Sequence, residues 1–108
     1  MLNVEYENRV DLDGNPSGGF CVGTGIHISW QNGPLGRGDE RKVPDGAFVE
    51  EVIEAARQRL EFYQSASDCR FACRENAEAI AKLEEALAWL KKRTDDREAR
   101  SVEGLHER

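Results

Sequence analysis

GAFVEEVIEAARQRLEFY, residues 46–63, is the stretch that decides the fold. Apolar side chains recur in it at steps of three and four residues: Val49, Val52, Ile53, Ala56, Leu60 and Tyr63. This spacing places them on one face of an α-helix. Asp45 is expected to cap this helix, and the glutamates that follow suit the positive end of its dipole. We therefore predict an amphipathic helix that begins near Gly46.

A second helix follows after a short break. QSASDCR (64–70) interrupts the pattern with small polar residues, and a longer apolar stripe then continues to about Arg93. Its members are Cys73, Ile80, Leu83, Leu87 and Leu90. Two helices joined by a short connector form an antiparallel hairpin, which we expect over residues 46–93. Residues 94–108 are expected to form a polar tail.

The N-terminal part has a different period. Leu2, Val4 and Tyr6 alternate with polar residues, as in a half-buried strand. The same alternation runs from Phe20 to Trp30, after the turn-rich segment DLDGNPSGG (11–19). We interpret residues 1–30 as an antiparallel β-hairpin or small meander, in which Gly23 and Gly25 indicate a bulge or a close backbone approach. The switch of period near Gly46 predicts an α+β fold.

Length and charge set limits on the protein class. At 108 residues we expect a single domain, 1–108, with residues 31–45 as a connecting loop. The net charge of −6 argues against binding to a DNA or RNA duplex or to an anionic membrane. No stretch is long and apolar enough for a membrane span, the first residues lack signal-peptide features, and three cysteines fit reduced thiols. A cytoplasmic protein is expected.

Neither the β portion (1–30) nor the helical hairpin (46–93) has much apolar surface to bury by itself. A two-stranded ribbon is marginal alone, and each helix of the hairpin carries one apolar stripe. We therefore expect a homo-oligomer.

The connecting loop is rich in glycine and cationic residues. WQNGPLGRGDERK (30–42) is longer than most connections and matches no known phosphate-loop motif. One interpretation is a solvated loop. The other is a functional loop, as long connections often are, with the cationic side chains of Arg37 and Arg41.

Asn76 breaks the apolar stripe of the second helix. It either pairs within the helix seam or faces a ligand, because an amide on an apolar seam needs partners. Tyr63 and Phe71 belong to the same end of the hairpin and are either core residues or rings that stack on a planar base. Candidate cations lie at the opposite end of the helix, about 25 Å away: Arg93, Arg97 and Arg100. Two antiparallel copies would bring the two ends together.

Catalytic and metal chemistry have little support. Cys69 and Cys73 are one helical turn apart and could bind zinc with His27 or His106, but small buried thiols are much commoner. A nucleotide hydrolase would need Glu75 or His106 as its base. We expect no enzyme, no metal and no cofactor.

Two segments resemble a known family. WQNGPLGRGDERKVPDGAFVEEVIEAARQRLEFYQ (30–64) and FACRENAEAIAKLEEALAWLKKRTDDREARSVEGLH (71–106) are similar to the first family of Thoeris anti-defence proteins. These are phage sponges for cyclic ADP-ribose isomers made by bacterial TIR-domain immune proteins. They are related to helical-hairpin sponges of cyclic oligonucleotides.

The resemblance implies sequestration of a cyclic nucleotide immune signal without its cleavage, in the host bacterial cytoplasm and at sites shared between subunits. It implies a ring on the adenine, supplied by Tyr63 or Phe71, and an amide supplied by Asn76. It also implies phosphate-binding cations, for which the candidates are Arg93 with Arg97 or Arg100, and Arg41. The alternative function is a small protein-interaction module that inhibits a host protein through its helical hairpin or edge strand.

Overall fold

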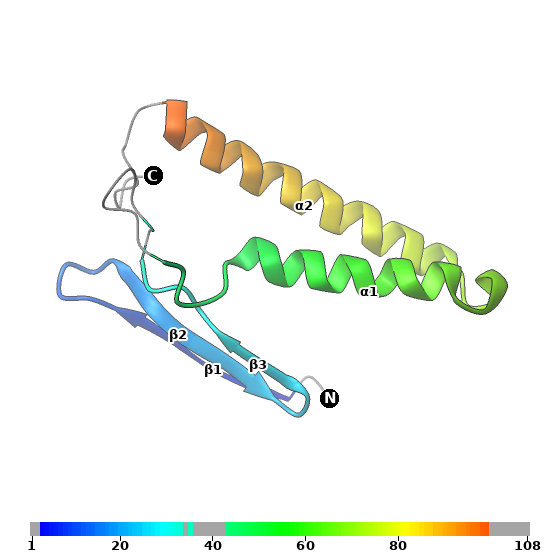
Figure 1. Ribbon diagram of the computed structural model, residues 1–108, viewed down its shortest axis with the longest axis horizontal. Helices are drawn as coiled ribbons and strands as arrows, with labels where there is room; N and C mark the ends of the chain where they lie inside the picture. Colours follow the sequence, from blue (N-terminus) through cyan, green and yellow to red (C-terminus); the bar gives the residue numbers. More distant parts are fainter. Residues whose placement is uncertain (1–2, 34, 36–42, 100–108) are drawn as a thin grey trace. The chain divides into compact units, whose positions relative to one another are not determined.

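The computed structural model describes residues 3–33, 35 and 43–99. Three strands precede two helices: β1 (Val4–Val10), β2 (Pro16–Gly23), β3 (Ile26–Ser29), α1 (Val49–Cys69) and α2 (Arg74–Ala99) (Figure 1). This order confirms the α+β class. Arg37, Arg41, Arg100 and His106 lie outside the described residues.

The three strands form an antiparallel sheet in the order β1-β2-β3. The turn between β1 and β2 is closed by Asp11, whose carboxylate accepts hydrogen bonds from the N–H groups of Asp13 and Asn15, both at 2.9 Å. A short aspartate side chain that bonds to the backbone ahead of it is a common way to stabilise such turns. Residues 11–15 therefore form the turn that the composition predicted, whereas residues 16–19 already belong to β2.

The alternating run from Phe20 to Trp30 is divided by a turn. Thr24 and Gly25 form a two-residue turn, in which Gly25 has a φ of +84° that glycine adopts at little cost. The turn reverses the chain, so Gly23 pairs with Ile26 and Val22 with His27. The N-terminal part is consequently the three-stranded meander, not the simple hairpin.

Gly19 and Gly23 allow the close backbone approach that glycines in a strand indicate. A Cβ on Gly19 would lie 2.1 Å from the carbonyl oxygen of Glu7, and one on Gly23 would lie 2.8 Å from that of Asn3. The register between β1 and β2 also shifts between Asn8 and Val10, where a bulge interrupts the pairing. Side chains at either glycine would therefore push β1 away from β2.

Gln31 ties the end of the sheet to the segment that leads into the hairpin. Its side chain is 9% exposed, and its Oε1 accepts hydrogen bonds from the N–H groups of Asp45 (2.9 Å) and Gly46 (3.1 Å). Its backbone N–H donates to Ala47, and the Asp45 carboxylate accepts from the N–H of Asn32 at 3.0 Å. Asp45 therefore holds this junction and is not the helix cap that the sequence suggested, since α1 begins only at Val49.

The two helices of the hairpin do not end at the residues that the sequence suggested. In α1 the helical backbone is interrupted at Ala66, Ser67 and Asp68, within the polar break that the sequence indicated. Ser67, Asp68 and Cys69 have φ values of 53°, 58° and 64°, which is a left-handed turn built without glycine. α2 continues to Ala99, so the expected end of the hairpin at Arg93 is too early.

Polar contacts between described residues connect α1 to α2 and to Cys73, which directly precedes α2. Gln64 bonds to the backbone of Cys73, Arg57 lies 3.7 Å from Glu84, and Arg93 lies 3.8 Å from Glu50. Their α1 members, Glu50, Arg57 and Gln64, are seven residues apart and so lie on one side of the helix. Their α2 partners follow in the reverse order, which defines the antiparallel register.

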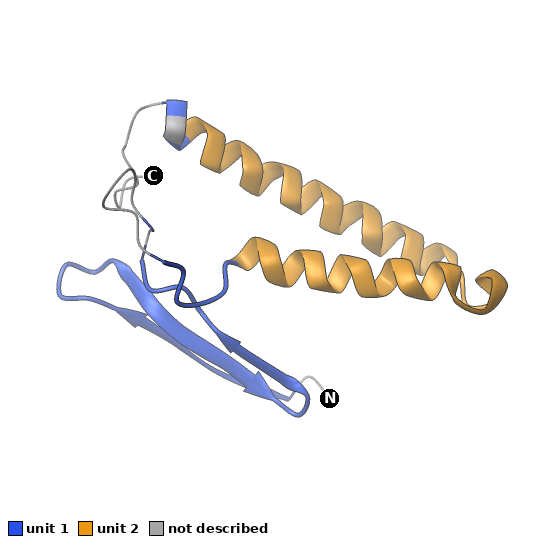
Figure 2. Cartoon of the chain, viewed as in Figure 1, with its two compact units in different colours: residues 1–48, 97–108 blue, residues 49–96 orange. Residues whose placement is uncertain are grey.

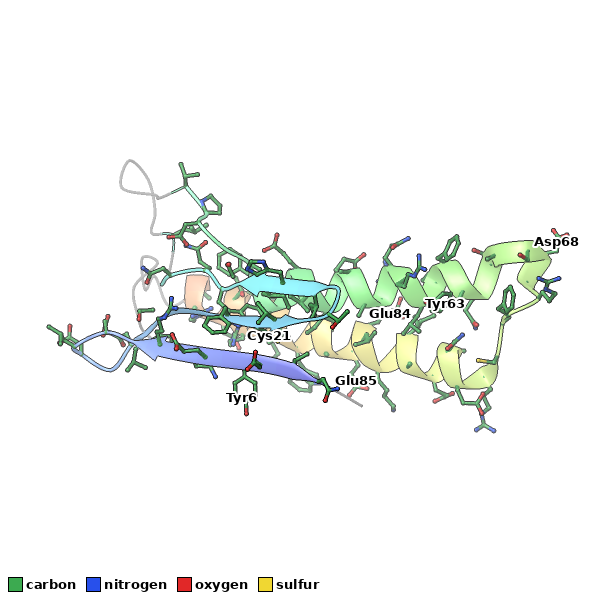
Figure 3. The ribbon with its side chains drawn as sticks, turned by 90° about the horizontal axis from the view of Figure 1, so that it is seen from below. Tyr6, Cys21, Tyr63, Asp68, Glu84 and Glu85 are labelled. Carbon is green, nitrogen blue, oxygen red and sulfur yellow. The ribbon has the colours of Figure 1, made fainter. Side chains whose placement is uncertain are left out.

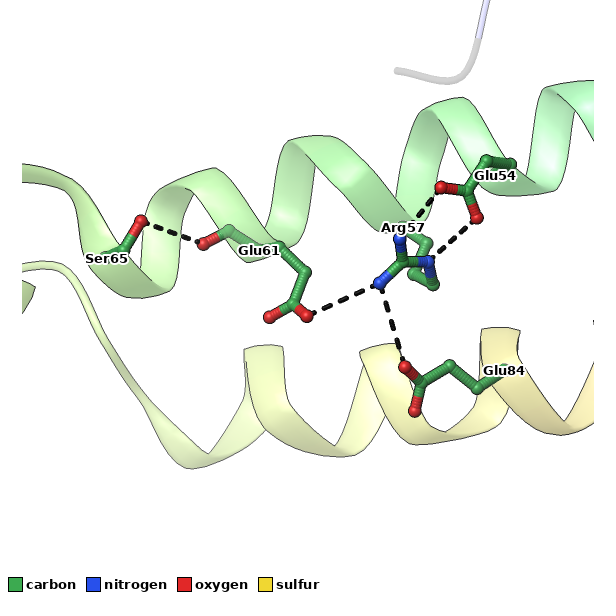
Figure 4. A network of polar contacts seen from close by, with 5 residues as sticks. All are labelled: Glu54, Arg57, Glu61, Ser65 and Glu84. Atoms are coloured by element: carbon green, nitrogen blue, oxygen red, sulfur yellow. Dashed lines mark hydrogen bonds and ion pairs between the residues drawn. The ribbon is translucent and has the colours of Figure 1, made fainter.

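Arg57 is the centre of the middle contact (Figure 4). Its guanidinium bonds to both carboxylate oxygens of Glu54 at 2.8 Å and contacts Glu61 on the same helix and Glu84 on the other. Hydrogen bonds to Glu54, then the nearby carboxylates, raise the pKa of Arg57 against a smaller effect of desolvation. The same hydrogen bonds lower the pKa of Glu54. A cation thus occupies a half-buried position on the helix seam, at 22% exposure of its side chain.

The apolar core is thin. Among the described apolar side chains, Ile80 alone is as little as 8% exposed, whereas Leu83, Leu87 and Leu90 are half-buried on the same stripe. The chain divides into two compact units, of which one contains the sheet and the other is Val49–Asp96 (Figure 2). The single-domain organisation expected from the sequence therefore stays a prediction. None of the described helices is long and apolar enough to cross a membrane.

Candidate functional site

The connector end of the hairpin gathers the aromatic candidates and Asn76. Gln64, next to Tyr63, forms hydrogen bonds with the backbone of Cys73. Asn76 follows Cys73 by less than one helical turn, in the first turn of α2. Phe71 lies in the connector itself, so all three candidates belong to this end (Figure 3 labels Tyr63 and Asp68 there). Tyr63 and Phe71 are 38% and 54% exposed, which shows that these rings are not core residues.

Cys73 lies at the start of α2, at this end of the hairpin. It precedes the first residue of α2, its carbonyl oxygen accepts the N–H of Ala77 at 3.2 Å, and its Sγ accepts the N–H of Asn76 at 3.4 Å. A side chain that accepts an N–H of the first turn in this way is an N-cap. Cys73 is therefore a helix cap, which the sequence interpretation as part of an apolar stripe missed.

The amide of Asn76 has no hydrogen-bond partner among the residues that the structure describes. The side chain is half-buried on the seam, and only its backbone N–H is paired, with the Cys73 sulfur. The interpretation in which Asn76 bonds to the facing helix is thus not what the structure shows. The Asn76 amide is not among the fully buried unpartnered polar atoms of the described residues, so water reaches it, and a ligand can form hydrogen bonds with it in place of that water.

Two arginines that sequence reasoning missed lie over the aromatic rings. The guanidinium carbon of Arg59 is 5.1 Å from the ring centroid of Phe62 and 5.0 Å from that of Tyr63, and its Nε donates to the Tyr63 hydroxyl at 3.3 Å. Arg70 lies in the same way over Phe71, at 4.9 Å. Cation–π contacts of this length hold a guanidinium flat against a ring while its N–H groups stay available.

The signal for these arginines was present in the sequence. Arg59 and Tyr63 are four residues apart on a helix, a spacing at which side chains meet, and Arg70 directly precedes Phe71. Neither arginine has a carboxylate partner among the described residues. The connector end therefore has arginines of its own, whereas the sequence had suggested cations at the opposite end of α2 and in the connecting loop.

The cations at that opposite end are less available. Arg93 is paired with Glu50, and the neighbouring Lys91 and Lys92 are paired with Asp95 and Asp96 at 2.8 and 2.9 Å. Arg97 is half-buried and has no ion pair among the described residues. Within one chain the structure does not bring Arg93 or Arg97 to Asn76, in agreement with the length of α2.

No group of three possible metal ligands occurs among the described residues. Cys69 and Cys73 are free thiols, and both are exposed. The buried-thiol interpretation of this pair is therefore wrong. His106, the other histidine considered with them, lies outside the described part of the chain.

The fold and this end of the hairpin define a class: a small α+β protein whose C-terminal helical hairpin presents aromatic rings, an unpaired amide and cations at its connector. The chain belongs to the Acb2/Tad1 hairpin domain family, whose model matches residues 23–95. The family resemblance noted in the sequence is thereby confirmed.

One relative is similar over most of this chain. Thoeris anti-defense 1 of Bacillus phage SBSphiJ7 is 52% identical over 81 residues, which are 75% of this chain and 52% of the relative. The chain thus spans about half the length of this curated relative. The family match covers β3, the loop and nearly all of the hairpin, whereas β1 and most of β2 precede it.

Proposed function

We propose that this protein is a phage anti-defence sponge that binds a cyclic nucleotide immune signal and keeps it from its effector. A cyclic ADP-ribose isomer is the first candidate ligand, and cyclic oligonucleotides are the second. Membership of the Acb2/Tad1 hairpin domain family and the similarity to a Thoeris anti-defence protein support this proposal. The observation that carries the proposal is that the Asn76 amide, unpaired among the described residues, belongs to the same end of the hairpin as the exposed rings of Tyr63 and Phe71.

The chemistry of the connector end suits a nucleotide. Tyr63 or Phe71 would stack on the adenine, which is planar and gains from contact with an aromatic face. The Asn76 amide can donate to and accept from a base edge, as its two kinds of polar atom allow. Arg59 and Arg70, already held over the rings, would offer N–H groups to phosphate oxygens.

Further cations would come from a second copy of the chain. In a homo-oligomer with antiparallel hairpins, Arg93 and Arg97 of one copy would reach the Asn76 end of the next, which makes the site intersubunit. The Arg93–Glu50 pair is 3.8 Å long and both side chains are partly exposed, so its exchange for a phosphate contact costs little. Arg37 and Arg41, outside the described residues, are proposed as additional cations of the same pocket, and Arg100 as a third.

We infer that the ligand is held and not cleaved, and that the protein acts in the host bacterial cytoplasm, where the signal is made. Sequestration needs only binding energy from stacking and charge-assisted hydrogen bonds. The groups at the connector end provide these interactions.

Calorimetry of the purified protein against cyclic ADP-ribose isomers, cyclic dinucleotides and cyclic trinucleotides tests the proposal. We expect saturable binding of at least one of them with no other protein present. Heating the loaded protein should then release the intact ligand into the supernatant. Absence of binding to the whole panel would overturn the sponge function and favour the protein-interaction module, and recovery of linear nucleotide would indicate a hydrolase.

A further inference from the structure

The sequence contains three pairs in which asparagine or aspartate precedes glycine: Asp13-Gly14, Asn32-Gly33 and Asp45-Gly46. In such a pair the backbone nitrogen of the glycine can attack the side-chain carbonyl carbon of the preceding residue. Glycine favours this attack because it has no side chain to crowd the approach and adopts unusual backbone angles at little cost. The attack requires that the glycine nitrogen lose its proton and turn toward that carbon. A hydrogen bond donated by the glycine N–H therefore protects the pair.

The two aspartate pairs are protected in this way. The N–H of Gly14 donates to the carbonyl oxygen of Asp11 at 3.0 Å, and the N–H of Gly46 donates to Gln31 Oε1 at 3.1 Å. The Gln31 side chain is buried, which strengthens the second bond by keeping competing water away from it. Both glycine nitrogens thus keep their protons and point away from the aspartate side chains.

Asn32-Gly33 lacks this protection. The N–H of Gly33 has no hydrogen-bond partner among the residues that the structure describes. Gly33 has a φ of +74°, in the region that glycine adopts without strain. Asn32 is exposed, so water and hydroxide reach its side chain. The pair therefore combines a free glycine nitrogen with an accessible amide.

The other asparagines do not share these properties. Asn3 and Asn8 precede residues of β1 that carry side chains, and Asn15 precedes a proline, which has no N–H to lose. The N–H that follows Asn76 donates to the carbonyl oxygen of Cys73 at 3.2 Å. Asn32 is thus singled out by its neighbour and by the hydrogen bonds around it.

We propose that Asn32-Gly33 is a site of spontaneous covalent modification in the folded chain. The deprotonated nitrogen of Gly33 bonds to Cγ of Asn32, the Cγ–Nδ2 bond breaks, and the side-chain nitrogen takes up a proton and leaves as ammonia. The product is a cyclic imide. Water then opens the imide at either carbonyl carbon, which gives aspartate or isoaspartate at position 32. Water is consumed and ammonia is released, so the conversion needs no oxidant and no enzyme.

The modification changes the junction at the end of the sheet. The N–H of Asn32 donates to the Asp45 carboxylate at 3.0 Å. Either product carries a new carboxylate on residue 32, close to that of Asp45, and like charges at short range repel each other. Isoaspartate also lengthens the main chain by a methylene group, because the chain then runs through the side chain of residue 32. The bond to Asp45 therefore weakens as the protein ages, whether or not the protein binds a nucleotide.

Mass spectrometry of protein aged in neutral buffer made with heavy-oxygen water tests the site. In the folded chain we expect deamidation and uptake of heavy oxygen at Asn32, whereas Asp13 and Asp45 stay unlabelled. In the chain unfolded with guanidinium, all three pairs should react, because the hydrogen bonds of Gly14 and Gly46 are lost. No reaction at Asn32 in the folded chain, or equal protection of Asn32 and Asp45 by folding, would overturn the proposal.

Gln31→Met tests the cause of the protection. The variant removes the acceptor of the Gly46 N–H, so Asp45-Gly46 should form isoaspartate about fivefold faster, as the loss of one ordinary hydrogen bond predicts. Asp13-Gly14 is the internal control, since it reacts only if the variant unfolds. Gln64→Ala, which removes hydrogen bonds of the hairpin, should leave Asp45 as in the wild type. An unchanged rate at Asp45 in folded Gln31→Met would refute this account of the protection.

Amide hydrogen exchange tests the consequence. Asn32→Asp reproduces the charge of the products, whereas Asn32→Gln keeps a neutral amide that cyclises far more slowly. We expect weaker protection of the residue 32 amide in Asn32→Asp than in Asn32→Gln, and protection in the wild type that falls with age toward the Asn32→Asp value. Equal protection in the two variants would contradict the weakening of the bond to Asp45. Calorimetry with cyclic ADP-ribose keeps the nucleotide proposal separate, because its failure would leave these masses and exchange rates unchanged.

Discussion

The side-chain amide of Gln64 forms two hydrogen bonds with the backbone of Cys73. Its Nε2 donates to the Cys73 carbonyl oxygen at 3.2 Å, and its Oε1 accepts the Cys73 N–H at 3.0 Å. The last regular turns of α1 are thereby joined to the cap of α2. This pair closes the hairpin at the end where the candidate site lies.

Replacement of Gln64 by alanine should destabilise the hairpin by about 1–3 kcal/mol, because two hydrogen bonds of roughly 0.5–1.5 kcal/mol each are lost. Urea unfolding followed by circular dichroism measures the change. Gln58→Ala is the matched control, since Gln58 is exposed on the same helix and should shift the midpoint little. Equal effects of the two substitutions would show that the Gln64 contacts contribute nothing specific.

Gln31→Met should weaken the attachment of Asp45 and Gly46 to the end of the sheet by about 1–3 kcal/mol. The N–H groups of Asp45 and Gly46 would lose their buried acceptor, and leaving such donors unpaired is costly. The loss is partly offset because Gln31 Nε2, which is buried and unpartnered, is also removed. Amide hydrogen exchange should quicken at Asp45 and Gly46 but not at Cys73. Unchanged protection at both amides would contradict the role assigned to Gln31.

Asn76→Leu should leave the fold intact and weaken nucleotide binding by about 1–3 kcal/mol, the cost of leaving polar atoms of the ligand without partners. Leucine suits the apolar stripe of α2, so stability should hold or rise. Calorimetry measures the affinity, and Glu78→Leu on the exposed face is the control that should bind as the wild type does. Wild-type affinity of the Asn76 variant would remove this residue from the site.

A mixed oligomer shows whether the site is shared. Arg93→Ala alone should weaken binding by removing a charge-assisted contact to phosphate. Co-expression with Asn76→Leu should restore a fraction of the sites, where intact Asn76 from one chain meets intact Arg93 from another. If folded and assembled mixtures show no rescue, the site lies within one chain and its cations are Arg59 and Arg70.

Acid should weaken the hairpin through Glu54. Hydrogen bonds from Arg57 lower the pKa of Glu54 in the folded chain, so the unfolded chain takes up the proton first as pH falls. The contribution of this pair is therefore complete above about pH 4.3 and is lost below it, as the pH passes through the lowered value. Urea midpoints between pH 7 and pH 3 should fall less steeply at the acid end for Glu54→Gln than for the wild type. Identical profiles would show that this carboxylate does not contribute.

The sequence predicted the elements better than the faces they present. A turn of two residues leaves the alternation of Phe20, Val22, Ile26 and Ile28 unbroken along the chain. Because Gly23 faces Ile26 across the turn, however, Phe20 and Val22 lie on one side of the sheet and Ile26 and Ile28 on the other. The periodicity of apolar residues depends only on their spacing along the chain, so it does not show that the residues after the turn lie on the other face of the sheet.

The sequence assigned three candidate residues to one end of the hairpin, and their role in binding stays a prediction. Tyr63 and Asn76 follow from the two helices, and Phe71 lies in the connector between them. Arg59 and Arg70 were missed because cation–π contacts depend on side-chain conformations, which the pattern of apolar residues does not specify. The capping role of Cys73 was missed because cysteine fits an apolar stripe equally well.

The junction at Gln31 has a consequence for protein engineering. Both ends of the segment between Asn32 and Asp45 are fastened to each other by hydrogen bonds, so the chain enters and leaves it at nearly one point. The entropy of closing a loop grows only with the logarithm of its length. A peptide tag or a small reporter domain inserted there would therefore leave both compact units folded.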